Sequence, residues 1–209
     1  MISYRKASFL TSAAKLQQLP PDFGFEVAFA GRSNAGKSSV LNCLTGNSRL
    51  ARTSKTPGRT QLINLFSLDD ERRLVDLPGY GYAKVSRQIK QDWQATLSAY
   101  LEERECLKGL VLLMDIRHPL KEADQMLAQW CCAGVLPCHI LLNKSDKLKR
   151  NAQLTALRQV KNAYKDFSEL VSVQTFSATK GEGLKDLVDR LNSWYAESNP
   201  EQTPNNEQE

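Results

Sequence analysis

A glycine-rich segment near the N-terminal end has the residue spacing of a phosphate-binding loop. Residues 31–38 read GRSNAGKS, which fits G-x-x-x-x-G-K-[ST] directly after an apolar run and before a segment of helical character. Gly31 and Gly36 let the backbone curl around phosphates, while the loop N–H groups and the helix N-terminus supply a positive field. Lys37 is predicted to contact the outer phosphates and Ser38 to coordinate Mg²⁺.

A second motif indicates which base accompanies these phosphates. Residues 143–146 read NKSD, fit N-K-x-D and follow the apolar run HILL. The Asp146 carboxylate can accept hydrogen bonds from guanine N1–H and N2–H₂, Lys144 can lay its stem over the base, and Asn143 can tie this loop to the glycine-rich loop. Adenine presents the wrong edge, and unpaired polar groups can discriminate by roughly 10⁴-fold or more. The two motifs together predict GTP binding.

Two further segments complete this candidate site. The stretch from Asp76 to Gly79 reads DLPG and fits D-x-x-G, so Asp76 is predicted to reach Mg²⁺ through a water and the Gly79 N–H to meet the γ-phosphate. Phe176-Ser177-Ala178 closes the last apolar run. It resembles a loop in which the N–H at the position of Ala178 supports guanine O6, although the Ser-Ala pair alone is a weak signal.

A basic segment lies between the first two motifs. Residues 48–60 contain no acid and four basic side chains: Arg49, Arg52, Lys55 and Arg59. The Thr-Pro-Gly sequence within the segment predicts a mobile loop that GTP orders, as in a nucleotide switch. Three threonines could supply the hydroxyl that closes on Mg²⁺: Thr53, Thr56 and Thr60. The residue types alone leave these alternatives open.

The residue after Gly79 bears on the rate of hydrolysis. It is Tyr80, whereas many GTPases keep a glutamine there that orients the attacking water. Unaided hydrolysis is therefore expected to be slow and to need another group or a partner. No Ser/His/Asp or Cys/His arrangement offers itself, and His118 and His139 are expected to be structural.

The elements that must position these motifs follow from apolar runs and helical periodicity. Strands are expected at 25–30, 62–68, 73–77, 110–116, 138–142 and 171–176, and helical stripes recur at 89–101, 154–164 and 184–195. Alternating strands and helices imply a mostly parallel sheet covered on both faces. The expected organisation is an N-terminal extension over 1–24, a GTP-binding domain over 25–196 and a disordered acidic tail over 197–209.

Composition narrows the class of protein further. The formal net charge is +5, and residues 197–209 carry four glutamates without a basic residue, so the body is near +9. This excess of positive charge favours either a polyanionic partner or simply a soluble basic surface.

The five cysteines show no metal-ligand spacing and are interpreted as reduced thiols. No signal-peptide core or membrane span is recognisable, which predicts a cytoplasmic protein that is not bound to a membrane.

Four segments together resemble one known family. GRSNAGKSS, ARTSKTPGRTQLIN, DLPGYGYA and MDIRHPL are similar to the EngB (YihA/YsxC) family of bacterial GTPases, within the TrmE-Era-EngA-YihA-septin-like group. The resemblance implies a three-layer α/β P-loop GTPase fold of the Ras type with a mostly parallel six-stranded sheet. It also implies a role in maturation of the large (50S) ribosomal subunit and an association with cell division and septation. The chain is expected to act as a monomer.

The resemblance also selects residues. It places the Mg²⁺-closing hydroxyl on Thr60, so the predicted catalytic residues are Lys37, Thr60 and Gly79, and the predicted metal ligands are Ser38, Thr60 and, through water, Asp76. In several related bacterial GTPases an asparagine at the position of Asn34 helps bind K⁺. The predicted GTP contacts are Gly31, Arg32, Ser33, Asn34, Ala35, Gly36, Lys37, Ser38, Ser39, Gly58, Arg59, Thr60, Gln61, Leu62, Asp76, Leu77, Pro78, Gly79, Asn143, Lys144, Ser145, Asp146, Phe176, Ser177 and Ala178.

Two other functions remain possible from the residues. A metabolic P-loop enzyme such as a small nucleotide kinase is disfavoured by the guanine motif and by the absence of a second Arg-rich substrate lid. A GTP-dependent protein-interaction switch in cell division, acting without RNA, is the stronger rival.

Overall fold

The computed structural model describes residues 2–51, 62–80 and 87–196. Strands β1 (Ser8–Ala13), β2 (Phe25–Gly31), β3 (Ile63–Ser67), β4 (Arg72–Asp76), β5 (Leu107–Asp115), β6 (Cys138–Asn143) and β7 (Val171–Thr175) form one sheet in the order β1-β3-β4-β2-β5-β6-β7. The pairs β1–β3 and β3–β4 are antiparallel, and the other pairs are parallel. The carboxyl ends of β2, β4, β5, β6 and β7 therefore meet at one edge.

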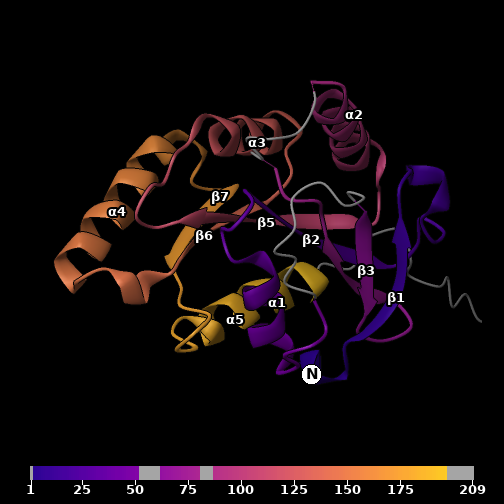
Figure 1. The fold of residues 1–209 in the computed structure, drawn as a ribbon, viewed down its shortest axis with the longest axis horizontal. Helices are drawn as coiled ribbons and strands as arrows, with labels where there is room; N and C mark the ends of the chain where they lie inside the picture. Colours follow the sequence, from indigo (N-terminus) through magenta and orange to yellow (C-terminus); the bar gives the residue numbers. More distant parts are fainter. Residues whose placement is uncertain (1, 52–61, 81–86, 197–209) are drawn as a thin grey trace, which may run out of the picture.

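Helices cover both faces of this sheet (Figure 1). They are α1 (Lys37–Thr45), α2 (Arg87–Glu103), α3 (Glu122–Ala133), α4 (Arg150–Ala163) and α5 (Leu184–Ala196), with α1 and α5 on one face and α2 and α3 on the other. In β5, Leu110 and Leu112 join the core on one face, while Val111 and Leu113 join the core on the other. This alternation buries residues 109–114 of β5 between the two layers of helices, as the apolar run predicted.

The sheet has one strand more than the six expected. The additional strand is β1, which lies within the segment assigned to an N-terminal extension and pairs along its length with β3. Phe9 and Leu10 of β1 are 59% and 45% exposed. An edge strand that buries so little carries no apolar run or clear alternation, which is why the sequence pattern missed it. The three-layer α/β fold itself is confirmed.

A buried carboxylate fixes the end of the sheet opposite the candidate site. Glu26 in β2 is fully buried and accepts hydrogen bonds from Arg73 Nε (3.0 Å), Arg104 Nη2 (2.7 Å) and the Tyr100 hydroxyl (2.8 Å). Since a buried charge is tolerated only when it is paired and hydrogen-bonded, these three groups are needed to hold Glu26. They link β2, β4 and the C-terminal end of α2, so the amino ends of the strands that carry the site are held in place.

His139 in β6 is a structural residue, as expected. The ring is buried, Nδ1 lies 2.8 Å from Ser172 Oγ, and Nε2 lies 2.8 Å from Gln174 Oε1 on β7. Burial lowers the pKa of His139 from 6.5 to about 4, because a charged imidazolium would lose its hydration. The neutral ring therefore belongs to the folded state.

This burial predicts a pH-dependent stability. Because the folded-state pKa lies below the unfolded value, the neutral ring imposes no penalty above pH 6.5, and stability falls as the pH drops from 6.5 towards 4. Each unit of pKa shift corresponds to about 1.4 kcal/mol, so His139 should account for about 3 kcal/mol of that loss. Urea unfolding of His139→Gln at pH 7 and pH 4.5 should show a smaller pH dependence than the unsubstituted chain. His118→Gln, which alters an exposed histidine, should leave the dependence unchanged, and equal dependence in all three proteins would contradict the assignment.

Candidate nucleotide site

The predicted motifs converge at the carboxyl edge of the sheet. The phosphate-loop motif follows β2, the D-x-x-G motif begins at the last residue of β4, and the N-K-x-D motif begins at the last residue of β6. The Ser-Ala segment follows β7. Crevices outside the carboxyl ends of parallel strands are where open α/β sheets bind ligands. The architecture therefore brings together motifs that are far apart in the sequence.

The phosphate loop turns sharply from β2 into α1. Asn34 has φ 67° and Gly36 has φ 94°, both in the left-handed region, and Gly36 is the N-cap of α1. A Cβ atom added to Gly36 would lie 2.4 Å from Asn143 Nδ2, so only glycine fits at this position. The loop is thus shaped by two residues with unusual backbone conformation, and its N–H groups and the helix N-terminus form a cradle for an anion.

One side chain braces three of the loops. Asn143 is buried, its Nδ2 donates to the carbonyl of Ala35 at 2.9 Å, and its Oδ1 accepts from the N–H of Ala178 at 3.4 Å. The phosphate loop, the N-K-x-D loop and the segment after β7 are therefore linked through a single amide. The predicted tie between Asn143 and the glycine-rich loop is present in the structure.

Lys144 crosses from the N-K-x-D loop to the phosphate loop. Its Nζ donates to the carbonyl of Asn34 at 2.6 Å and lies 3.0 Å from Asp115 Oδ2. Asp115 also pairs with Arg117 at 2.6 Å. Although partial burial opposes it, hydrogen bonds from Arg117 and Lys144 hold the pKa of Asp115 well below its ordinary value. An ionised carboxylate thus fixes the lysine stem that could cover a base.

The sequence motifs did not identify Asp115 as a candidate site residue. It is the last residue of β5 and lies in the MDIRHPL segment, which was used only for the family resemblance. Its position at the carboxyl end of a strand was the available signal.

Asp146 is held as a charged acceptor. The Ser177 hydroxyl donates to its Oδ1 at 2.7 Å, and Lys147 Nζ lies 3.2 Å from its Oδ2. The hydrogen bond from Ser177 is the main cause that lowers the pKa of Asp146, with Lys147 adding to it. The Ser145 N–H donates to the Phe176 carbonyl at 3.0 Å, which joins the two loops on the side of the base. The arrangement can present two carboxylate oxygens to a ring with adjacent N–H donors.

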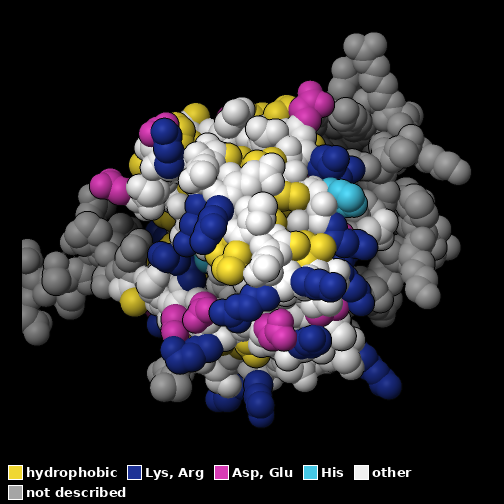
Figure 2. Space-filling model, turned by 90° about the vertical axis from the view of Figure 1, so that its left-hand side faces the viewer, with side chains coloured by type: hydrophobic (Ala, Val, Ile, Leu, Met, Phe, Trp, Pro, Cys, Tyr) yellow, Lys and Arg dark blue, Asp and Glu magenta, His cyan; other side chains and the backbone are white. Residues whose placement is uncertain are grey.

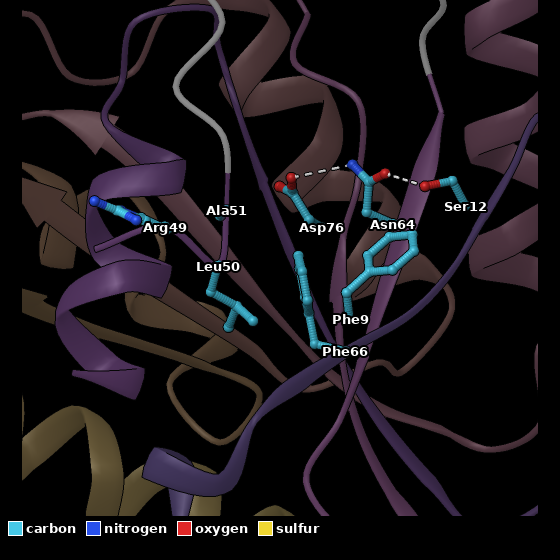
Figure 3. A pocket seen from close by; sticks show the side chains of 8 residues that line it. All are labelled: Phe9, Ser12, Arg49, Leu50, Ala51, Asn64, Phe66 and Asp76. Carbon is cyan, nitrogen blue, oxygen red and sulfur yellow. Dashed lines mark hydrogen bonds between the residues drawn. The ribbon is translucent and has the colours of Figure 1, made fainter. Parts of the chain in front are cut away.

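The metal candidates lie beside the start of α1. Lys37 Nζ pairs with Asp76 Oδ1, so the carboxylate at the end of β4 is next to the first turn of the helix that contains Ser38. Asn64 of β3 donates to the other Asp76 oxygen at 3.4 Å and accepts from Ser12 of β1 at 2.7 Å (Figure 3). Mg²⁺ in nucleotide sites takes one or two carboxylates together with phosphate oxygens and waters. Asp76 and Ser38 fit that donor set.

A cavity of about 520 Å³ adjoins this carboxylate (Figure 3). Its wall includes side chains of the β1–β3 edge and of the segment after α1: Phe9, Ser12, Arg49, Leu50, Ala51, Asn64, Phe66 and Asp76. The cavity places Arg49, from the basic segment, on the same side of the molecule as the metal candidate.

The Tyr80 side chain is buried against α3. It is 4% exposed, and its hydroxyl donates to Asp124 Oδ1 of α3 at 2.7 Å. The backbone of Tyr80 bonds to the phosphate loop, accepting from the Ser33 N–H at 2.7 Å. The tyrosine therefore couples the D-x-x-G loop to α3 and to the phosphate loop.

The remaining predicted contacts divide into two groups. Those in the described part lie on the loops above or next to them: Gly31, Arg32, Ser33, Ser39, Leu62, Leu77, Pro78 and Gly79. The others fall outside the described residues: Gly58, Arg59, Thr60 and Gln61, together with the rival threonines Thr53 and Thr56. The expected tail over 197–209 also lies outside them.

Comparisons with known proteins agree with this geometry. The family described as "50S ribosome-binding GTPase" matches residues 26–144. The chain is 56% identical over 193 residues to the probable GTP-binding protein EngB of Enterobacter sp. (strain 638), covering 92% of this chain and 93% of that protein. It is 53% identical over 194 residues to its counterpart in Coxiella burnetii (strain CbuK_Q154), covering 93% and 95%.

Solved structures show the same fold. A crystal structure of a probable GTP-binding protein EngB superposes with a TM-score of 0.67 at 21% identity, covering 83% of this chain and all of that one. Era in complex with MgGDPNP and nucleotides 1506–1542 of 16S ribosomal RNA superposes with a TM-score of 0.63 at 23% identity, covering 85% and 59%.

The fold, the phosphate loop and the guanine-type loop define a P-loop GTPase, a protein that binds GTP and hydrolyses it to GDP. None of the helices in the described part has the length and apolarity to cross a bilayer. The chain belongs to the EngB family of GTP-binding proteins.

Proposed function

We propose that this GTPase is a switch in the assembly of the large ribosomal subunit, working as a monomer in the cytoplasm. The observation that carries the proposal is the match to a family of 50S ribosome-binding GTPases over residues 26–144. The basic composition of the chain, +5 overall, supports a partner rich in phosphate. The GTP-bound form docks on a precursor particle, and hydrolysis releases it.

The arrangement of the site supports the following roles for its residues. The loop N–H groups of residues 31–38 hold the phosphates, and Lys37 leaves Asp76 for the outer phosphates when GTP enters. Asp76, through a water, together with Ser38 and Thr60 would hold Mg²⁺. Mg²⁺ supplies positive charge that offsets the charge developing on the phosphoryl oxygens. The Gly79 N–H senses the γ-phosphate.

The base is held by the loops after β6 and β7. Asp146 accepts from guanine N1–H and N2–H₂, Lys144 covers one face of the ring, and the Ala178 N–H donates to O6. Asn143 keeps these groups in register with the phosphate loop, because its amide already donates to the Ala35 carbonyl. A preorganised set of this kind loses little entropy when the nucleotide binds.

Docking is expected to use the basic segment that contains Arg49. GTP orders this segment through Thr60, and its arginines and lysine then contact ribosomal RNA phosphates. Neutralising Arg49, Arg52 and Lys55, which are not among the predicted GTP contacts, should spare GTP binding and weaken particle binding.

Gradient sedimentation with precursor large subunits tests the proposal. The chain should co-sediment with the particles in the presence of a non-hydrolysable GTP analogue, and at least about tenfold less with GDP, since only the γ-phosphate orders the docking segment. Sedimentation away from the particles in both nucleotide states would contradict the ribosomal role. That result would favour the rival function, a protein-interaction switch in division and septation that does not act on RNA.

Asn34 suggests how hydrolysis could be stabilised without a glutamine after Gly79. Its side chain is exposed at the phosphate loop and makes no hydrogen bond within the described part of the chain. If Asn34 helps hold K⁺ beside the β- and γ-phosphates, the ion places positive charge where an arginine finger acts in other GTPases. Hydrolysis should then be faster in KCl than in NaCl at equal ionic strength, by about tenfold or more for one such stabilising charge.

The control for this effect is a substitution in the helix that follows the loop. Asn34→Ala should abolish the salt preference, whereas Ser39→Ala, which alters an exposed side chain in the first turn of α1, should keep it. The assay should be run with and without ribosomal particles. Equal rates in both salts under both conditions would remove K⁺ from the mechanism.

A further inference from the structure

The segment around α4 has a one-sided composition. From Lys147 to Lys165 the chain contains six basic residues and no aspartate or glutamate: Lys147, Lys149, Arg150, Arg158, Lys161 and Lys165. All six side chains are exposed. Lys147 pairs with Asp146 of the nucleotide site, and the other five have no role in that site.

The helix presents these groups on its outer surface. Ala156 and Val160 are buried where α4 packs against β7, while Arg150, Arg158 and Lys161 are spaced by eight and three residues and therefore share one stripe. Figure 2 views the molecule from the side on which α4 lies in Figure 1, and blue lysine and arginine side chains are more common there than the magenta acidic ones that lie among them. The charge is thus arranged along the helix.

The charges of this stripe are not neutralised by the protein. Among the described residues no acidic side chain pairs with Arg150, Arg158 or Lys161, and none pairs with Lys149 or Lys165. By contrast, Lys185 of α5 lies 2.6 Å from Asp189 one turn later. Groups that keep their full charge can exchange small counterions for phosphates, which is the main source of nucleic-acid affinity.

We propose that this α4 face, defined as Lys149, Arg150, Arg158, Lys161 and Lys165, is a binding surface for the phosphate backbone of structured RNA. Fourteen helical residues extend about 21 Å, a length along which a nucleic-acid duplex presents roughly a dozen phosphates. Asn151, Gln159 and Asn162 are exposed between the cations and can donate to phosphate and ribose oxygens. The choice of RNA as the polyanion rests on the proposed function.

The apolar content of the surface argues against a membrane. Leu154 is the one large apolar side chain of α4 that is strongly exposed, at 40%, whereas a helix that lies on a bilayer buries a broad apolar face. Phe167, 47% exposed, follows Lys165 closely and offers a ring on which a base can stack.

The position of α4 makes this contact independent of the nucleotide. The helix packs on β7 at one edge of the sheet, whereas Arg49 and the cavity beside Asp76 lie towards β1 and β3 at the other edge. The α4 face therefore binds RNA in both nucleotide states, and the GTP-dependent docking of the proposed function adds to it.

Fluorescence anisotropy with a labelled 20-base-pair RNA hairpin tests the inference in the presence of GDP and of a GTP analogue. The test variant carries Arg150→Gln, Arg158→Gln and Lys161→Gln, which lie outside the nucleotide site. The control variant loses the same charge elsewhere, through Arg5→Gln, Lys6→Gln and Lys15→Gln, all of them exposed. Unchanged GTP binding verifies that both variants are folded.

The unsubstituted chain should bind the hairpin in both nucleotide states, and any additional affinity with the GTP analogue should be the same in the unsubstituted chain and the α4 variant. The α4 variant should bind the hairpin at least about tenfold more weakly near 100 mM salt. Its plot of log K against log[salt] should also be less steep, by about 2 to 3 in slope, since each lost phosphate contact contributes up to about 0.9. The control variant should lose less than about threefold, since its charges lie away from the RNA.

Three outcomes would overturn the inference. The two variants could lose affinity for the hairpin equally, or the hairpin could bind only in the presence of the GTP analogue. The α4 variant could also lose as much affinity for polyglutamate as it loses for the hairpin. The two proposals can be tested independently. If the hairpin binds through α4 but the chain does not bind precursor particles, the proposed function is wrong and the inference about α4 is not.

Discussion

Asp146→Asn is expected to lower the affinity for GTP by about 10³-fold or more and to raise the affinity for xanthosine triphosphate, because the amide replaces one acceptor with a donor. Guanine N2–H₂ then faces an N–H₂ group, whereas the C2 oxygen of xanthine can accept from it. The prediction depends on the charged state of Asp146, which Ser177 and Lys147 stabilise. Competition binding with GTP, ATP and XTP measures the change in relative affinity for the three nucleotides.

Two further variants separate recognition of the base from general disturbance. Ser177→Ala removes the hydrogen bond that orients Asp146 and should weaken GTP by about tenfold without changing base preference, since both carboxylate oxygens remain acceptors. Asp189→Asn alters an exposed carboxylate on α5 and should have no effect. An unchanged preference for GTP in Asp146→Asn would remove this residue from base recognition.

Gly36→Ala is expected to abolish nucleotide binding, with a loss of at least about 100-fold, since misplaced phosphate-binding groups cost that much. The added methyl group would meet Asn143 Nδ2 at 2.4 Å in a residue with φ 94°. Asn143 would have to move, and with it the braces to Ala35 and Ala178. One methyl group should therefore disturb the phosphate and base sites together.

Gly46→Ala is the matched control. Gly46 also has positive φ, at 63°, but an added Cβ would find its nearest neighbour at 3.8 Å, in Arg5. This variant should lose about 1–2 kcal/mol of stability from backbone strain and keep its affinity for GTP. Isothermal titration of both variants, with thermal unfolding alongside, distinguishes the two effects. Similar affinities for GTP in the two variants would show that the contact with Asn143 is not needed.

The buried strands and the loops that follow them could be predicted from the sequence because they combine two strong signals. An apolar run marks a buried strand, and a motif of fixed spacing directly after it marks the sheet edge where ligands bind, as for Asn143 after β6. Strand β1 gives neither signal, since Phe9 and Leu10 are exposed and its hydrogen bonds to β3 involve backbone groups of any residue type.

Side-chain partnerships within the site were harder to predict. The contact of Asp115 with Lys144 joins two strands that are neighbours only in the folded sheet, and nothing in the MDIRHPL segment specifies the partner. The direction of Tyr80 is a similar case. Its place after Gly79 showed that a glutamine is missing, but its hydrogen bond to Asp124 depends on how α3 packs.

A crystal structure of this chain with Mg²⁺ and a non-hydrolysable GTP analogue tests the account most directly. We predict that both Asp146 carboxylate oxygens lie about 2.7–3.1 Å from guanine N1 and N2, that Lys37 Nζ has moved from Asp76 to the outer phosphates, and that the hydrogen bond from Asn143 to Ala35 is retained. A base bound away from Asp146, or Lys37 still paired with Asp76 beside bound phosphates, would contradict it.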